Sequence, residues 1–411
     1  MFAFKKRILA ITLALFLVFA VIPAASASPA ATFGTMDSPV VELAEGIEFG
    51  FIPDAMVGSL TQPTYRILAA KMIAMLADTL YGKCIDAIAA EKGFDMVGTF
   101  ADNNDKIEEL LGVVDPLMPY DSARLYRDVE TLANYYPQIL TLASIGETVL
   151  GNDIPLLIIG RGSRPILWIG AIHAREAVTC AYLMLLAEEY TNAYCGATGY
   201  GNYSAARVQQ LLDEFTIYIV PMANPDGVDI VTANGPSNVR VDNVVTWRNN
   251  AEGVDLNRNF PFYWETANAN ATAENRLYYR GASAGSEPET RALMNLCDSV
   301  SFEHLLSCHT AGQVVIWRDN GNGAIPGDED LAWTISQTMG YPMQAPTASG
   351  WGGGFENWFR NEYQRPGICL EFARMNTARP QDIARFYTDD MVSWDTSKNL
   401  LLAVLDSISL N

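Results

Sequence analysis

Ile169-Gly-Ala-Ile-His-Ala-Arg-Glu-Ala-Val-Thr179 is the stretch around which the rest of the chain is organised. It begins in an apolar run, residues 166–172, that predicts a buried strand, and it continues into residues 176–193, which predict an amphipathic helix. His173 and Glu176 therefore stand three residues apart at the entrance to a helix, where both lie on one face. An imidazole nitrogen and a carboxylate oxygen placed in this way can bind the same metal ion.

A second histidine segment offers a third donor. A catalytic zinc normally takes three protein ligands and keeps a fourth position for water. The chain has only three histidines, which are His173, His304 and His309. His309 lies in Leu305-Leu-Ser-Cys-His-Thr-Ala-Gly312, near the end of an apolar run and before a glycine, where a strand is expected to end. Because a histidine at a strand end is more often a hydrogen-bonded structural residue, the spacing alone leaves both interpretations open.

The His-x-Arg-Glu segment and the later histidine resemble the zinc metallocarboxypeptidase family. In that family the first two zinc ligands lie in such a segment, and a third histidine follows more than a hundred residues later. The resemblance covers residues 120–411 and implies one zinc ion held by His173, Glu176 and His309. It also implies an α/β fold with a mixed, mostly parallel sheet flanked by helices. Apolar strands that alternate with helices along these residues favour the same architecture.

Two further segments match the catalytic residues of the family. Glu371 interrupts the apolar run Gly367-Ile-Cys-Leu-Glu-Phe-Ala373. Because an unpaired buried carboxylate is costly, Glu371 is expected to face a cavity or a partner. By resemblance it is the general base, with a structural ion pair as the alternative. Arg248, in Thr246-Trp-Arg-Asn-Asn250, matches the arginine that stabilises the oxyanion.

The residues expected to bind the substrate's terminal carboxylate also come from the resemblance. Gly253-Val-Asp-Leu-Asn-Arg-Asn-Phe260 matches the segment whose adjacent Asn and Arg hold that carboxylate, which in this chain are Asn257 and Arg258. A guanidinium binds a carboxylate through two hydrogen bonds, and the amide adds another donor. The alternative is a turn that only hydrogen-bonds its own loop. Arg175 is expected to assist carboxylate binding from within the zinc motif.

Glu356 is the candidate for reading the side chain of the substrate's C-terminal residue. In ungapped register with Glu371, Trp358 falls where the family has its characteristic tryptophan. Glu356 then falls at the position that selects the substrate side chain. An acid there is similar to the arrangement in family members that prefer Lys or Arg. A one-residue gap would instead leave Glu356 solvated on a glycine-rich loop.

Two departures from the family pattern indicate a bacterial subset. The residues after His309 are Thr-Ala-Gly, where the classical enzymes have Ser-Tyr. The family's mobile tyrosine has no counterpart in register, since Ser349 stands there and the nearest upstream tyrosine is Tyr341. The His-Thr-x-Gly segment and Gly352-Gly-Gly-Phe-Glu-Asn-Trp-Phe359 resemble the bacterial γ-D-glutamyl-diaminopimelate peptidases. That likeness implies peptidoglycan stem peptides as substrates.

The N-terminus predicts export. A basic start, the apolar run 8–22 and Ala25-Ser-Ala27 are typical of a cleaved secretory signal peptide over residues 1–27, which predicts a secreted or cell-surface protein. Residues 28–115 predict a small helical module that resembles an S-layer homology repeat and implies cell-wall association. A helical prosegment is the alternative. Residues 116–411 remain as the catalytic domain.

Composition limits the partners. The chain has 411 residues, 49% of them hydrophobic, which is enough for one large domain and a smaller one. Its formal net charge of −20 disfavours nucleic acid, so no nucleic-acid partner is expected. The six cysteines show no Cys-x-x-Cys spacing. Cys180, Cys308 and Cys369 are predicted to be buried free thiols, with one disulfide as the alternative in an exported protein. A monomer is expected.

The sequence supports three classes of function. The first is a secreted zinc carboxypeptidase that hydrolyses the amide bond next to a free C-terminal carboxylate, in peptidoglycan stem peptides or, as the runner-up, in ordinary peptides. The second is a non-catalytic wall-binding protein that retains the fold, which the loss of Glu371 or of a zinc ligand would favour. The third is a zinc deacylase on a related fold, which would not need Asn257 and Arg258 to read a carboxylate.

Overall fold

The computed structural model describes residues 113–116, 120–232, 246–267, 278–318, 324–344, 352–374 and 392–409. The chain divides into two compact units at residues 113 and 114, and all the labelled helices and strands belong to the second unit. The predicted signal peptide and nearly all of the module at 28–115 lie outside the described residues. None of the described helices is long and apolar enough to cross a membrane.

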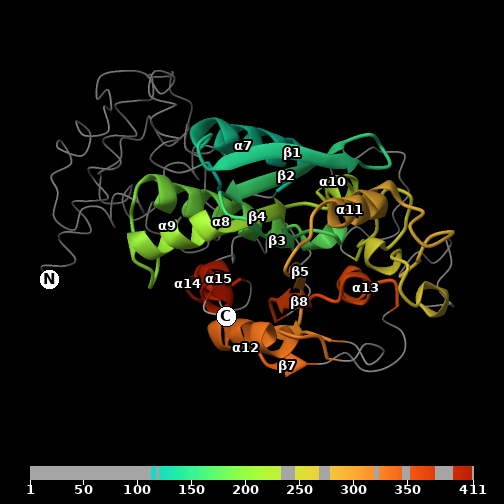
Figure 1. Ribbon diagram of the computed structural model, residues 1–411. Helices are drawn as coiled ribbons and strands as arrows, with labels where there is room; N and C mark the ends of the chain where they lie inside the picture. The colour runs from blue at the N-terminus through green and yellow to red at the C-terminus, as the bar shows by residue number, and fades with distance from the viewer. Residues whose placement is uncertain are drawn as a thin grey trace, which may run out of the picture. The chain divides into compact units, whose positions relative to one another are not determined.

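An eight-stranded sheet forms the centre of the second unit (Figure 1). The strand order is β1-β2-β4-β3-β5-β8-β6-β7. The strands are β1 (Leu140–Glu147), β2 (Asp153–Gly160), β3 (Arg164–Ile169), β4 (Phe215–Val220), β5 (Leu305–Thr310), β6 (Val314–Ile316), β7 (Met343–Gln344) and β8 (Gly367–Phe372). Strands β4, β3, β5 and β8 run parallel in the middle, whereas β1, β2 and β6 pair with their neighbours β2, β4 and β8 in antiparallel fashion. The prediction of a mixed sheet is confirmed.

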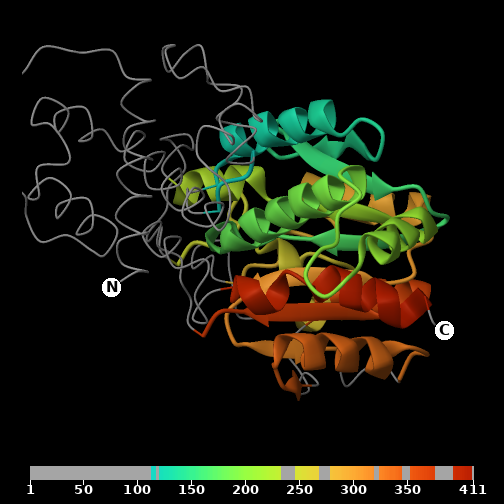
Figure 2. The same cartoon turned by 90° about the vertical axis from the view of Figure 1, so that its left-hand side faces the viewer.

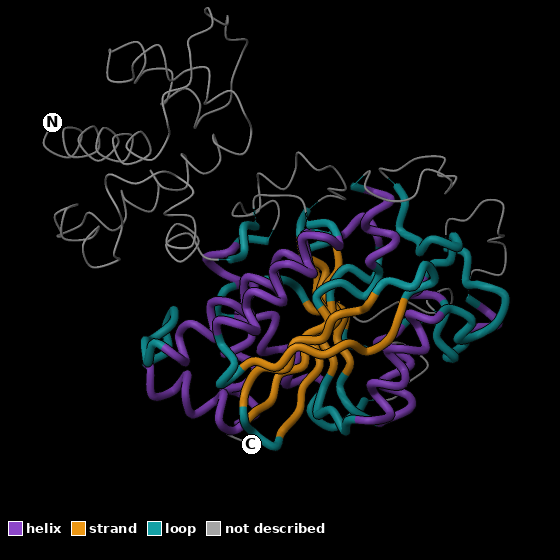
Figure 3. The backbone as a smooth tube through the Cα atoms, turned by 90° about the horizontal axis from the view of Figure 1, so that it is seen from above, coloured by secondary structure: helices purple, strands orange, loops and turns teal. Residues whose placement is uncertain are grey.

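Helices cover both faces of this sheet, as the view from above shows (Figure 3). They are α7 (Ser122–Tyr135), α8 (Val178–Cys195), α9 (Ala205–Glu214), α10 (Pro225–Val231), α11 (Pro288–Ser299), α12 (Asp328–Met339), α13 (Phe355–Tyr363), α14 (Trp394–Ser397) and α15 (Leu400–Ser409). Helices α8, α9 and α15 lie on the face that Figure 2 turns toward the viewer, and α11 and α13 lie on the other. The flanking helices of the predicted architecture are therefore present.

The predicted bounds of the strand and the helix around the zinc motif were wrong where the two elements meet. Strand β3 ends at Ile169, and helix α8 begins only at Val178. A short 3₁₀ helix, η2 (Ala174–Glu176), lies between them. Helix α8 is also not amphipathic, because it is buried on nearly all sides. The sheet and α9 pack against it, and the hydroxyl of Tyr182 on α8 donates a hydrogen bond to the backbone oxygen of Ser397.

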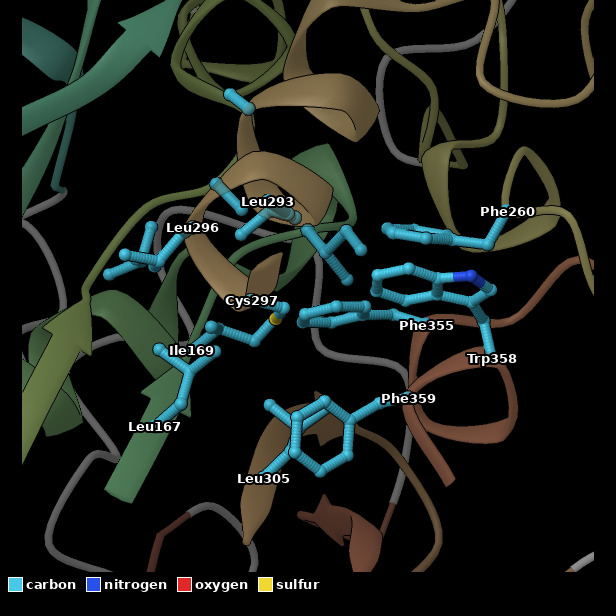
Figure 4. Close-up of a cluster of buried hydrophobic side chains, with 14 of the residues drawn as sticks. Leu167, Ile169, Phe260, Leu293, Leu296, Cys297, Leu305, Phe355, Trp358 and Phe359 are labelled. Carbon is cyan, nitrogen blue, oxygen red and sulfur yellow. The ribbon is translucent and has the colours of Figure 1, made fainter. Parts of the chain in front are cut away.

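Stacked aromatic rings fix helix α13 against the sheet. The rings of Phe260 and Phe355 lie 4.7 Å apart and 25° from parallel, and Trp358 stacks 6.0 Å from Phe355 (Figure 4). Phe355 and Trp358 are three residues apart and so share the helix face that enters the core. Aromatic pairs in this geometry contribute about 0.5–1.5 kcal/mol beyond their area burial.

A buried ion pair sets the rotation of the same helix. Arg360, which is fully buried, pairs with the buried carboxylate of Asp328 at the start of α12. Removing one partner of such a pair costs about 3–5 kcal/mol, because it leaves the other charge buried and unpaired. With Phe355 in the core and Arg360 directed to α12, the intervening face of α13 carries Glu356 toward β5 and β8.

Candidate active site

The carboxyl ends of the parallel strands β3, β5 and β8 open into a cleft of about 230 Å³. Ligands of open α/β sheets bind at this edge because the loops that follow the strands meet there. His309 on β5 is paired in register with Glu371 on β8, so the two side chains face the same side of the sheet. His173 and Glu176 reach the same place from the turn that follows β3.

His173, Glu176 and His309 have the spacing that a metal ion requires. The Nδ1 atom of His173 lies 3.0 Å from Oε1 of Glu176, and the Nδ1 atom of His309 lies 3.1 Å from Oε2. The two Nδ1 atoms are 3.2 Å apart. Ligands about 2.0–2.1 Å from a tetrahedral zinc lie about 3.3 Å from one another, so the set fits zinc without rearrangement. All three side chains are buried.

A carboxylate lies behind each imidazole. Oδ1 of Asp255 is 3.3 Å from Nε2 of His173, and Oε1 of Glu356 is 3.0 Å from Nε2 of His309. Carboxylates in these positions hold the proton on Nε2 and leave Nδ1 free as the metal ligand. Burial alone would raise the pKa of Asp255, but the charges of Arg248 and His173 outweigh it, and the pKa falls below its ordinary range.

Glu371 stands beside this cluster with one carboxylate oxygen unengaged. Its Oε2 atom is buried and makes no hydrogen bond to any described residue. Burial raises the pKa of Glu371 to about 7, with the negative charge of Glu176 adding to the rise and the nearby His309 opposing it. A base poised near neutral pH can both accept and release a proton during one reaction cycle.

Asn257 is held so that its amide nitrogen faces the cleft. Its Oδ1 atom accepts a hydrogen bond of 2.7 Å from the backbone N–H of Phe355, and its Nδ2 atom lies 3.4 Å from Oε2 of Glu356. The residues before α13 can pack closely on this turn because position 353 is a glycine, where a Cβ would lie 2.1 Å from the backbone oxygen of Arg258. Arg258 follows on the same 3₁₀ turn, η3 (Leu256–Arg258), and lines the cleft.

The remaining predicted site residues also line the cleft. Arg248 pairs with Asp255 through an Nε to Oδ2 distance of 2.9 Å. Arg175 lies beside Glu176, with 3.9 Å between Nε and Oε1. Glu356 is only 6% exposed and lies on α13, so the alternative of a solvated acid on a glycine-rich loop is wrong.

The structure adds residues that the sequence reasoning did not assign. Asp255 lies in the segment Gly253–Phe260, from which only Asn257 and Arg258 were predicted to have a function. Tyr278 lines the cleft, and the guanidinium groups of Arg248 and Arg258 lie 4.7 Å and 5.8 Å from its ring centre. Tyr341 does not line the cleft; it is nearly buried, and its backbone oxygen accepts a hydrogen bond from Ser336.

The thiols follow the expectation at two of three positions. Cys180 and Cys308 are buried and free, and all five cysteines within the described ranges are free. Cys369 is half-buried, because β8 turns its side chain toward the cleft that it helps to line.

Comparison with known proteins now gives the family. Residues 125–358 match the family described as zinc carboxypeptidase. The chain belongs to this family. It is therefore a zinc peptidase, and its His173–Glu176–His309 site is compatible with one zinc ion.

Two relatives are consistent with this assignment. The chain is similar to gamma-D-glutamyl-L-diamino acid endopeptidase 1 of Lysinibacillus sphaericus, at 31% identity over 66% of this chain and 69% of that protein. It is also similar to the carboxypeptidase N catalytic chain of Homo sapiens, at 28% identity over 47% of this chain and 42% of the relative.

Two solved structures share the fold. Thrombin-activatable fibrinolysis inhibitor superposes with a TM-score of 0.57 at 18% identity, over 72% of this chain and 76% of the other. Carboxypeptidase A from Helicoverpa armigera gives 0.52 at 20% identity, over the same shares of the two chains.

Substitution of His309 tests the ligand set. His309→Ala should abolish zinc binding, whereas the wild-type protein should hold about one equivalent by metal analysis. His304→Gln is the matched control, because His304 is also buried but accepts a hydrogen bond from Trp168 and does not line the cleft. The assignment of His309 as a ligand fails if His309→Ala retains a full equivalent of zinc.

Proposed function

We propose that this zinc carboxypeptidase-family protein is an exported enzyme that removes the C-terminal residue of peptidoglycan stem peptides. One observation carries the proposal. A single cleft combines the metal-binding set with a carboxylate whose pKa is about 7 and with an Asn-Arg pair suited to a free carboxylate. A non-catalytic wall-binding protein would not need the first two, and a deacylase would not need the third.

Each residue has a role in the proposed reaction. A bound zinc ion supplies a Lewis acid that activates water and polarises the scissile carbonyl. Glu371 accepts the proton of the attacking water and then donates it to the nitrogen of the leaving amine. Arg248 donates hydrogen bonds to the carbonyl oxygen as negative charge develops on it.

The terminal carboxylate of the substrate is bound next to these groups. The Nδ2 atom of Asn257 and the guanidinium of Arg258 are donors on one turn, and Arg175 lies across the same cleft. A fixed carboxylate sets the distance from the chain end to the reacting bond, which makes the enzyme remove one residue at a time.

One observation suits a stem peptide and a lysine-ended peptide alike, and a second favours the stem peptide. Glu356 places a buried negative charge in the cleft, which suits an amine on the side chain of the C-terminal residue. The relative from Lysinibacillus sphaericus is named for a γ-D-glutamyl bond to a diamino acid. Diaminopimelate, like lysine, carries a side-chain amine.

Export and wall association complete the proposal. The signal-peptide pattern of residues 1–27 supports export, and we propose that residues 28–115 act as a wall-binding module or as a prosegment. The proposed enzyme works as a monomer on a peptide or muropeptide with a free carboxylate. Fractionation of the producing cells with antibody against residues 120–411 tests where the mature protein lies.

Product analysis tests the proposed substrate. Mature enzyme should release diaminopimelate from L-Ala-γ-D-Glu-diaminopimelate, as detected by mass spectrometry, and the C-terminally amidated substrate should resist cleavage because Asn257 and Arg258 then lack their anion. Hippuryl-lysine and hippuryl-phenylalanine represent ordinary peptides. Cleavage of these peptides without cleavage of the muropeptide would refute the peptidoglycan proposal, and equal cleavage of the amide would refute the exopeptidase.

Glu371→Gln tests the general base. The variant should retain zinc and bind substrate but lose turnover by about 10² or more, the usual scale for an acid-base group. In the wild type, kcat/KM should fall as the pH falls, because protonation removes the base. The midpoint of this fall should lie between 4.5, the ordinary pKa of a glutamate, and about 7, the pKa of Glu371 without metal. The positive charge of zinc favours the ionised carboxylate and so lowers the pKa. Near-normal turnover in Glu371→Gln would place the base elsewhere.

Glu356→Gln tests the reading of the side-chain amine. The amide keeps an oxygen that can accept the hydrogen bond from His309, so zinc should stay bound. Substrates with a C-terminal side-chain amine should lose about 1–3 kcal/mol in kcat/KM, the scale of one charge-assisted contact. A phenylalanine-ended peptide serves as the control and should be nearly unchanged. Equal losses on both substrates would show that Glu356 does not read the side chain.

A further inference from the structure

Strand β6 and the residues that follow it form the part of the cleft farthest from β3. Ile316 on β6 is paired in register with Gln344 on β7 and with Cys369 on β8, and all three residues line the cleft. Val314 is paired with Glu371. Moving along β6 from Val314 to Ile316 therefore leads away from the general base and toward Arg318.

Arg318 differs from Arg248 and Arg175, which also line the cleft, in having no anionic partner among the described residues. Arg248 pairs with Asp255, and Arg175 lies beside Glu176. Within the described ranges, the guanidinium of Arg318 makes no ion pair and only stacks on the ring of Trp317, at 4.8 Å. Arg318 lines the cleft and is half-buried, so a ligand in the cleft can contact it.

The lining of the cleft near Arg318 combines apolar and charged residues. Ile316 of β6 and Gly367 and Cys369 of β8 contribute to it. A Cβ at Gly367 would lie 2.7 Å from the backbone oxygen of Glu356, so α13 packs closely on the strand and brings that acid to the pocket. In the part of the chain that the structure describes, no ion pair joins Glu356 to Arg318, which leaves one negative and one positive charge facing the same space.

We infer that Arg318 is a second specificity residue, which binds a carboxylate on the side chain of the substrate's C-terminal residue while Glu356 faces its amine. The preferred residue then has a methylene stem that ends in both an amine and a carboxylate. The inference rests on the proposed function for the reaction, but it concerns Arg318, to which that function assigns no role. A guanidinium is suited to it because it binds a carboxylate through two parallel hydrogen bonds.

Diaminopimelate and lysine provide a matched pair of probes, because they share the stem and the amine and differ by one carboxylate. Wild-type enzyme should cleave L-Ala-γ-D-Glu-meso-diaminopimelate with a kcat/KM at least about tenfold above that for the lysine-ended tripeptide. Arg318→Gln should lower kcat/KM for the first by roughly tenfold or more, the scale of one charge-assisted contact, and leave the second within about twofold. Arg318→Glu should reverse the preference.

Arg365→Gln is the control, because Arg365 is exposed and does not line the cleft. It removes the same charge and should leave the ratio of the two substrates unchanged. Equal losses on both tripeptides in Arg318→Gln would overturn the inference and show that Arg318 supports the cleft without reading the substrate.

Calorimetry separates the failure of this inference from the failure of the proposed function. Free meso-diaminopimelate should bind zinc-loaded wild-type enzyme more tightly than free lysine does, and Arg318→Gln should remove the difference. If the enzyme cleaves neither tripeptide but shows this binding difference, the proposed reaction is wrong and the inference about Arg318 holds. If the two amino acids bind equally to the wild type and to the variant, the inference is wrong whatever the enzyme cleaves.

Discussion

The parallel register of β5 and β8 is the constraint on which the site depends. His309 and Glu371 are directly paired across these strands, and each lies near the carboxyl end of its strand. Side chains alternate between the two faces of a strand, so a slip of one residue would turn Glu371 away from the metal ligands. The register is fixed by burial, because every residue of β5 is buried and β8 contributes Ile368, Leu370 and Phe372 to the core. The position of the base is thus a consequence of how an apolar strand packs.

The buried carboxylates around the cluster explain both its affinity for a cation and the behaviour of the base. Glu176, Asp255, Glu356 and Glu371 converge on one region, where arginines that include Arg175, Arg248 and Arg258 offset their charge. Burying carboxylates is costly unless cations compensate them, so a divalent ion stabilises the arrangement. Burial raises the pKa of Glu371, and the negative charges of Glu176 and Glu356 add to the rise while His309 and Arg248 oppose it. Metal binding and base strength are therefore two results of one electrostatic field.

The sequence predicted the parts of this site that lie in strongly patterned segments. The histidines and Glu371 interrupt or follow apolar runs, where burying a polar side chain is costly and therefore indicates a function or a partner. Tyr278 carries no such signal, since its place in the cleft depends on a left-handed backbone (φ 61°) that is rare for tyrosine. The prediction that α8 is amphipathic was wrong for a related reason. The spacing of its apolar residues could not reveal that α9 and residues 397–398 cover its outer side. Expectations for residues 1–112 remain predictions.

The short strands at the β6–β7 edge separate specificity from catalysis. Strands β3, β5 and β8 carry or precede the ligands and the base, and their long apolar contacts make them hard to alter. Strand β6 has three residues and β7 has two, and neither holds a ligand. A substitution at Arg318 therefore changes one end of the pocket without moving β5. Glu356 is less independent, because the carboxylate that faces the pocket also accepts from His309. Of the two side chains that face the pocket, Glu356 is therefore the one whose replacement has to preserve a hydrogen bond to a metal ligand.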